Sequence, residues 1–174
     1  MLLLTGIASA LELPATDGKS YDPAAAGDKK AIVLFFVSPF CSTTKSFMKE
    51  INQITADYSD RVAVYLVHSD PEITNEVAME HTILSEVKAT VLLDKEQALA
   101  KQVQARITPE AVVLSPKSAT LYKGRINDLY LGPTKRQRAA TTKDLRDALD
   151  AVLGGKPVPA PQPEAQGCKI GGMK

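Results

Sequence analysis

The chain has 174 residues, with 21 Lys and Arg against 20 Asp and Glu, and a net charge of +1. This balance gives no electrostatic reason to expect nucleic acid or an anionic membrane as a partner. The chain contains two cysteines and no tryptophan. Two cysteines exclude a disulfide scaffold of the small secreted type, and the lack of tryptophan does not suggest a base-stacking platform.

The first ten residues, MLLLTGIASA, form an apolar leader. The apolar run and Ala8-Ser9-Ala10 match two of the three parts of a secretion signal, but the basic leading segment is missing. The alternative is a first strand or a plain apolar leader. The signal interpretation favours an extracytoplasmic or periplasmic protein, and the alternative favours the cytoplasm. No segment has the roughly 20 consecutive apolar residues that a membrane span requires.

Residues 11–154 are expected to form one domain, and its first half begins with a turn-rich stretch, Pro14–Lys30. The run AIVLFFV is a strand buried on both faces, because it is continuously apolar and rich in β-branched residues. Phe47, Ile51, Ile54 and Tyr58 then recur at helical spacing. These patterns predict a strand at Ala31–Val37, a helix at Ser42–Tyr58 and a strand at Arg61–His68.

The second half of the domain alternates in the same way. A helix is expected from Pro71, with Ser69 or Asp70 as its cap and with Val77 and Leu84 facing inward. The later elements are a strand at Ala89–Leu93, a helix at Lys95–Val103 capped by Asp94, strands at Glu110–Ser115 and Ala119–Lys123, and a helix from Thr142 to Leu153. This order predicts an α/β fold with a mixed central sheet and helices on both faces.

Residues 155–174 differ in composition from the domain. Pro157, Pro159, Pro161 and Pro163 alternate with other residues, which favours an extended polyproline-like arm. The arm leads to Cys168 in a glycine-rich end.

Cys41 is the first candidate for chemistry, because it follows a buried strand and opens a helix. Sites in open α/β sheets gather at the carboxyl ends of strands. The unpaired N–H groups and the dipole of a helix start favour thiolate over thiol. The alternative is a cysteine that is merely a small buried apolar side chain.

Several segments resemble the thioredoxin superfamily, and within it the redoxin group. Leu34–Phe47, LFFVSPFCSTTKSF, resembles the strand, active-site turn and helix of that fold, and Arg106–Pro109 resembles its threonine and cis-proline turn. Leu13–Pro23 resembles the leading hairpin of the redoxin group, and Val91–Val113 is also similar to that group. The resemblance implies a thioredoxin-like fold with Cys41 as nucleophile. It also implies a substrate site, for which we expect Pro39, Phe40, Thr108, Pro109 and Arg125.

The chain departs from that family at functional positions. Thr44 replaces the second cysteine of the CxxC motif, so the motif is CxxT and cannot form a disulfide within itself. Thr44 either donates its hydroxyl to the Cys41 thiolate or has no role. Ser38 and Pro39 do not match the peroxidatic motif of peroxiredoxins, and Lys45 breaks the CxxxC motif of copper chaperones.

Cys168 is the second candidate. An extended arm of 14 residues spans about 40 Å, so Cys168 can return to Cys41. There it would act as a resolving cysteine that attacks a mixed disulfide or sulfenic acid. A free thiol on a mobile tail and an intermolecular link are the alternatives.

The remaining polar candidates have plainer interpretations. Arg125 and Asp128 form a surface ion pair, or Arg125 lies near the thiolate. His68 and His81 each lack a second ligand at metal-binding spacing, so structural or solvated histidines are expected and no metal site is assigned.

Two functions are compatible with the sequence. The first is a thiol-dependent oxidoreductase with antioxidant activity, which uses Cys41, Thr44 and Cys168 on peroxide or protein disulfide substrates. A thiol reductant regenerates it, and no dissociable cofactor is implied. The second is a non-catalytic binding or assembly module that holds an extended peptide, or a metal through Cys41 and Cys168.

Overall fold

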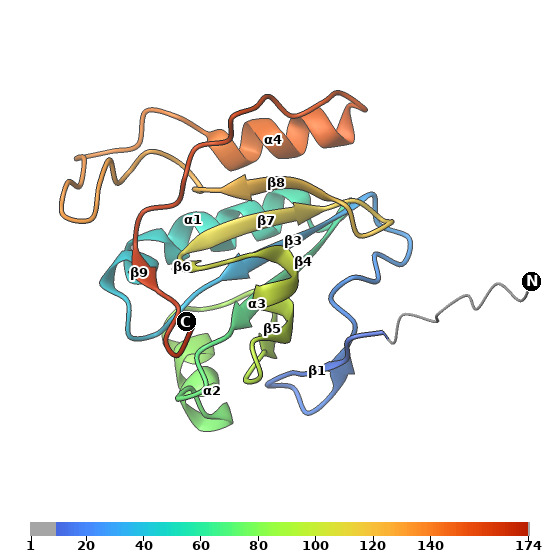
Figure 1. Ribbon diagram of the computed structural model, residues 1–174, viewed down its shortest axis with the longest axis vertical. Coiled ribbons are helices and arrows are strands. Elements are labelled where there is room, and N and C mark those ends of the chain that lie inside the picture. The colour runs from blue at the N-terminus through green and yellow to red at the C-terminus, as the bar shows by residue number, and fades with distance from the viewer. Residues whose placement is uncertain (1–9, 174) are drawn as a thin grey trace, which may run out of the picture.

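A five-stranded sheet in the order β5-β4-β3-β7-β8 lies at the centre of the computed structural model, which describes residues 10–173 (Figure 1). Apart from Ala10, the leader expected at residues 1–10 lies outside the described residues. The parallel strands are β3 (Ala31–Phe36), β4 (Val62–His68) and β5 (Thr90–Leu93), and the antiparallel ones are β7 (Glu110–Leu114) and β8 (Thr120–Gly124). The predicted mixed sheet is confirmed.

The side chains of β3 alternate between two hydrophobic cores, so every residue of this central strand is buried. Val33 and Phe35 pack with α1 (Ser42–Tyr58) and α4 (Asp144–Leu153) on one face of the sheet. Ile32, Leu34 and Phe36 pack with α3 (Ala98–Val103) on the other face. Helices therefore cover both faces, as predicted. None of the helices within residues 10–173 has the length and hydropathy that crossing a membrane requires.

The first strands form a small hairpin beside this sheet. β1 (Leu13–Pro14) pairs antiparallel with β2 (Ser20–Tyr21), within the segment Leu13–Pro23 that resembles the leading hairpin of the redoxin group. Leu13 and Ala15 are buried in the same core as α3. The hairpin thus closes one end of that core.

Helix α2 (Asn75–Leu84) begins later than the sequence predicted. Its N-cap is Thr74, whose side chain accepts a hydrogen bond from Val77 N–H, so Ser69 and Asp70 do not cap it. Asp70 instead accepts from Glu72 N–H in a preceding turn. Leu84 is 76% exposed, so its expected inward position is also wrong.

Two other predicted caps act differently from the expectation. Asp94 precedes α3 by four residues, yet its carboxylate accepts from the N–H groups of Leu99 and Ala100 at 3.1 and 2.9 Å. The N-cap of α4 is Lys143 rather than Thr142. The Thr142 hydroxyl accepts from Asp128 N–H, which ties it to the preceding loop.

From Gln162 onward the C-terminal arm is packed against the domain (Figure 1). The Gln162 amide pairs with Lys123 N–H and Leu121 C=O, and Arg125 N–H donates to Pro163 O. Further along, β9 (Cys168–Lys169) pairs antiparallel with β6 (Ile107–Thr108). Residues 162–170 of the arm therefore form a strap, which runs from the edge of β8 to β6.

Candidate active site

Cys41 and Cys168 are joined by a disulfide, with their Cα atoms 6.0 Å apart and a sequence separation of 127. The sequence left three states of Cys168 open, and the structure shows the intramolecular pair. Cys41 is only 2% exposed in this state. The strap therefore covers the cysteine that the sequence marked as reactive.

Cys41 occupies the N-cap position of α1, because the turn after β3 ends at this residue. Its backbone is extended, with φ −103° and ψ 116°, and its C=O accepts the first helical hydrogen bond, from Lys45 N–H. The first turn of α1 contains no acidic residue. The positive end of the helix dipole at Cys41 is thus not offset by a carboxylate on that turn.

Thr108, in β6, contacts the sulfur of Cys41. Its carbonyl oxygen is 3.3 Å from Cys41 Sγ, and the peptide bond between Thr108 and Pro109 is cis. A disulfide sulfur carries no hydrogen, so this contact becomes a hydrogen bond only when Cys41 is a protonated thiol. The structure brings together Cys41, Cys168, Thr108 and Pro109.

Thr44 has a different partner from the one expected. Its hydroxyl accepts a hydrogen bond from Ser38 N–H at 3.3 Å, and its side chain is fully buried. In this oxidised state Thr44 therefore fixes the turn that leads to Cys41. A catalytic role for Thr44 stays a prediction.

A cavity of about 590 Å³ opens beside Cys41. Pro39 and Phe40 line it together with Val77, His81 and Leu84. Phe40 is 66% exposed and Leu84 76% exposed. Two of the residues expected to contact substrate thus lie at a partly apolar surface next to the cysteine.

His68 and His81 lie together beneath this surface, although the sequence treated them as separate. Their ring centroids are 5.3 Å apart, and His68 Nδ1 lies 3.1 Å from Val37 O. Burial lowers the pKa of His68 to about 4, with a further contribution from His81. Burial also lowers the pKa of His81. Both rings are therefore neutral near pH 7. The sequence offered one signal for this pair: His68 ends β4, and His81 lies on α2, the helix that follows.

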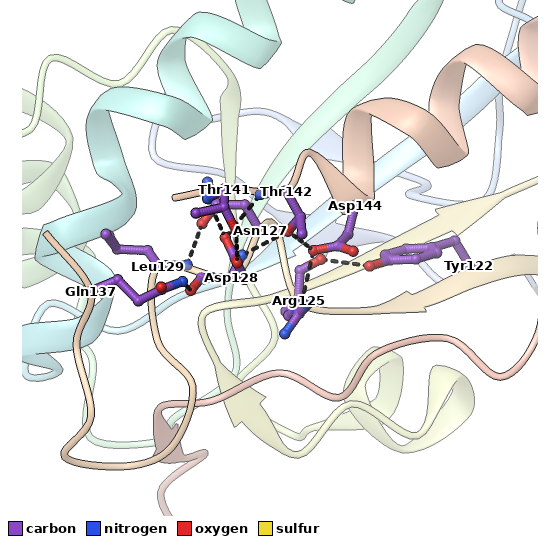
Figure 2. Close-up of polar contacts among 9 residues, drawn as sticks. All are labelled: Tyr122, Arg125, Asn127, Asp128, Leu129, Gln137, Thr141, Thr142 and Asp144. Atoms are coloured by element: carbon purple, nitrogen blue, oxygen red, sulfur yellow. Dashed lines mark hydrogen bonds and ion pairs between the residues drawn. The ribbon is translucent and has the colours of Figure 1, made fainter. Parts of the chain in front are cut away.

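Arg125 lies in the loop after β8 (Figure 2). Its Nε is 2.9 Å from Asp144 Oδ2, so the expected ion pair with Asp128 is wrong. Two hydrogen bonds hold the backbone of Arg125 in place. The Tyr122 hydroxyl donates to Arg125 O at 2.6 Å, and Arg125 N–H donates to Pro163 O. Arg125 does not line the cavity beside Cys41.

Asp128 instead organises the loop before α4 (Figure 2). Its carboxylate accepts hydrogen bonds from Thr141 N–H, the Thr141 hydroxyl and Thr142 N–H. These bonds, led by the Thr141 hydroxyl, hold its pKa well below the usual range. Sequence reasoning missed this role, because the acceptor and its donors are 13 and 14 residues apart.

The sequence matches the redoxin family over residues 7–149. The chain belongs to the redoxin family. This redoxin resembles two crystal structures: a hypothetical protein from Sinorhizobium meliloti (27% identity, TM-score 0.79) and an uncharacterised protein from Geobacillus kaustophilus (25% identity, TM-score 0.80). The alignments cover 92% and 94% of this chain and 89% and 90% of those chains.

The fold of this redoxin is thioredoxin-like, as the sequence resemblance implied. It aligns with a secreted disulfide oxidoreductase from Mycobacterium tuberculosis at 14% identity and a TM-score of 0.59, over 84% of this chain and 96% of that one. No curated protein matches the sequence.

Proposed function

We propose that this redoxin is a thiol–disulfide oxidoreductase in which Cys41 is the nucleophile and Cys168 is the resolving cysteine. One observation carries the proposal: Cys41 is bonded to Cys168, while Thr44 stands at the position where a CxxC motif would place the second cysteine. The fold shared with a disulfide oxidoreductase also supports it. Thr108 and Pro109 beside the sulfur provide an edge for an extended protein substrate.

The reaction proceeds in two exchange steps. The Cys41 thiolate attacks one sulfur of a substrate disulfide, so that a mixed disulfide forms and one substrate thiolate leaves. Cys168 then attacks Cys41 Sγ as a thiolate, which forms the Cys41–Cys168 disulfide and releases the second substrate thiolate. The substrate gains two electrons and the redoxin loses two. Two thiols of a reduced partner regenerate the protein by the reverse steps and become a disulfide themselves.

The packing of the strap supports the second step. Hydrogen bonds of Gln162 and Ile170 hold it to the domain on both sides of Cys168, independently of the disulfide. Such anchors keep Cys168 at a high effective concentration near Cys41. The N-cap position of Cys41 supports the first step, because the helix dipole favours a thiolate there.

The other candidates have less support. Peroxide would oxidise Cys41 to a sulfenic acid that Cys168 resolves with loss of water, but Arg125, one alternative for which was a position near the thiolate, is paired with Asp144. A metal bound through Cys41 and Cys168 requires both to be free thiolates, and the two are bonded to each other. Thiol–disulfide exchange on protein substrates is therefore the function we favour.

Trapping of the mixed disulfide tests the proposal. Reduced wild-type protein, Cys168→Ser and Cys41→Ser are each mixed with oxidised glutathione and analysed by mass spectrometry after acid quenching. We expect a glutathione adduct to accumulate on Cys41 in Cys168→Ser, and an internal disulfide without adduct in the wild type. Equal adduct levels in the wild type and in Cys168→Ser would contradict a resolving role for Cys168.

A further inference from the structure

The strand β6 is an edge that the strap occupies, and its pairing is made by backbone atoms. Thr108 pairs with Cys168 and Ile107 with Lys169, while Ile170 N–H donates to Arg106 O at 2.9 Å. Backbone pairing of this kind accepts any extended peptide, since it uses no side chain of the added strand. Selectivity must therefore come from the side chains that flank the cysteine.

Gly167, immediately before the cysteine, has no space for a side chain. A Cβ at this position would overlap Thr108 O and lie 2.9 Å from Thr108 C and 3.3 Å from Pro109 Cδ. These atoms belong to the backbone and ring of the turn that faces Cys41, so they cannot rotate away as a flexible side chain would. The position before the cysteine is thus restricted to glycine.

Ile170, two positions after the cysteine, is almost completely buried. It is 4% exposed and belongs to the hydrophobic core that includes Val103 and Ala105. Lys169, between the cysteine and Ile170, is exposed and therefore unrestricted.

From these contacts we infer that the site binds protein substrates whose cysteine lies in an extended Gly-Cys-x-Φ segment, where Φ is a branched aliphatic residue. The strap carries this sequence itself, as Gly167–Ile170, and occupies the site in the oxidised state. The inference rests on the proposed exchange at Cys41. It adds that the substrate segment displaces residues 167–170 from β6 and pairs there in the same register while its cysteine is bonded to Cys41. The Gln162 contacts still hold the rest of the strap to the domain.

The test compares peptides that differ only at the two restricted positions. Ala-Gln-Gly-Cys-Lys-Ile-Gly, which copies residues 165–171, is prepared as a mixed disulfide with thionitrobenzoate, along with variants carrying Val before the cysteine or Asp two positions after it. Formation of the Cys41–peptide disulfide in the full-length Cys168→Ser protein is followed by thionitrobenzoate release and mass spectrometry. Each rate is divided by the rate of that peptide with free glutathione, which removes differences in intrinsic reactivity.

We expect the Val peptide to react at least about tenfold more slowly than the parent and the Asp peptide about tenfold more slowly, which corresponds to about 1.4 kcal/mol each. A second variant, Gly167→Ala in the Cys168→Ser background, weakens docking of the strap and is expected to raise the parent peptide's rate. Rates for the three peptides within twofold of one another would overturn the inferred selectivity while leaving the exchange function intact. Rates for all peptides no faster than that of free cysteine would instead contradict the proposed function.

Discussion

The imidazole ring of His68 lies edge-on to that of His81, with ring centroids 5.3 Å apart and an interplanar angle of 70°. His81 lines the cavity beside Cys41, and His68 is buried next to it. Neither ring is charged near pH 7, because burial lowers the pKa of both. The pair makes the stability of the fold sensitive to acid.

His68 should make the protein less stable as the pH falls below its ordinary pKa. The folded state holds the pKa at about 4, against 6.5 for the ordinary side chain. Between these values the unfolded chain binds a proton that the folded chain does not, so the free energy of unfolding decreases by roughly 3 kcal/mol as the pH falls from 6.5 to 4. Urea unfolding at several pH values measures this slope.

His68→Gln should reduce that slope, whatever its effect on stability at pH 7. His81→Gln is the matched control, with a smaller expected change, because His81 is more exposed than His68. A His68→Gln protein with the same pH dependence as the wild type would show that this ring does not titrate as described.

Phe40→Ala should separate substrate docking from folding. Phe40 is 66% exposed at the cavity beside Cys41, so its removal should change the free energy of unfolding by less than about 0.5 kcal/mol. We expect the rate with a protein disulfide substrate to fall severalfold. Ile83→Ala is the control, because Ile83 is 72% exposed but does not line the cavity. Equal rates for the two variants would argue against docking at Phe40.

Asp128→Asn should destabilise the protein at neutral pH. The carboxylate accepts three hydrogen bonds from Thr141 and Thr142, and an amide has only one acceptor oxygen. Because these bonds lower the pKa of Asp128 from its ordinary 3.8, their stabilisation is present above that pH and is lost as the pH falls through the folded value. The difference in unfolding midpoint between variant and wild type should therefore shrink below pH 3.8. A difference that is constant from pH 7 to pH 2 would contradict this.

Reduction of the disulfide should destabilise the protein without unfolding it. The bond closes a loop of 127 residues, and chain entropy for a loop of this size gives about 5 kcal/mol at most, with losses of about 2 to 5 kcal/mol usual for native disulfides. Urea unfolding with and without dithiothreitol measures the loss. Cys168→Ser should be insensitive to the reductant. A loss below about 0.5 kcal/mol in the wild type would show that the bond does not constrain the chain.

The sequence predicts the parts of this fold whose signals are local. The continuous apolar run at β3 and the helical spacing of Phe47, Ile51 and Ile54 identify the centre of the fold, and α1 has the predicted bounds. The placement of Cys41 at the start of a helix follows from the same two patterns. These elements are determined by the periodicity of neighbouring residues, which a single sequence displays.

Contacts between distant residues carry no such periodic signal. Arg125 pairs with Asp144, 19 residues away, rather than with Asp128, whose carboxylate accepts hydrogen bonds from Thr141 and Thr142. Thr142 is not the N-cap of α4, because its hydroxyl accepts a hydrogen bond from Asp128 N–H in the preceding loop. The docking of the strap likewise depends on hydrogen bonds between Gln162 and the backbone of Lys123 and Leu121, which are 39 and 41 residues away in sequence. Its proline pattern predicts extension but not where it docks.

If Cys41 and Cys168 form one redox couple, as we propose, equilibration in glutathione buffers will show it. Wild-type protein is held at a series of ratios of reduced to oxidised glutathione, quenched with acid, alkylated and analysed by mass spectrometry. We expect both thiols to disappear together in a single two-electron transition, with only doubly alkylated protein and the Cys41–Cys168 disulfide present. Separate transitions for the two cysteines, or stable glutathione adducts on either, would contradict it.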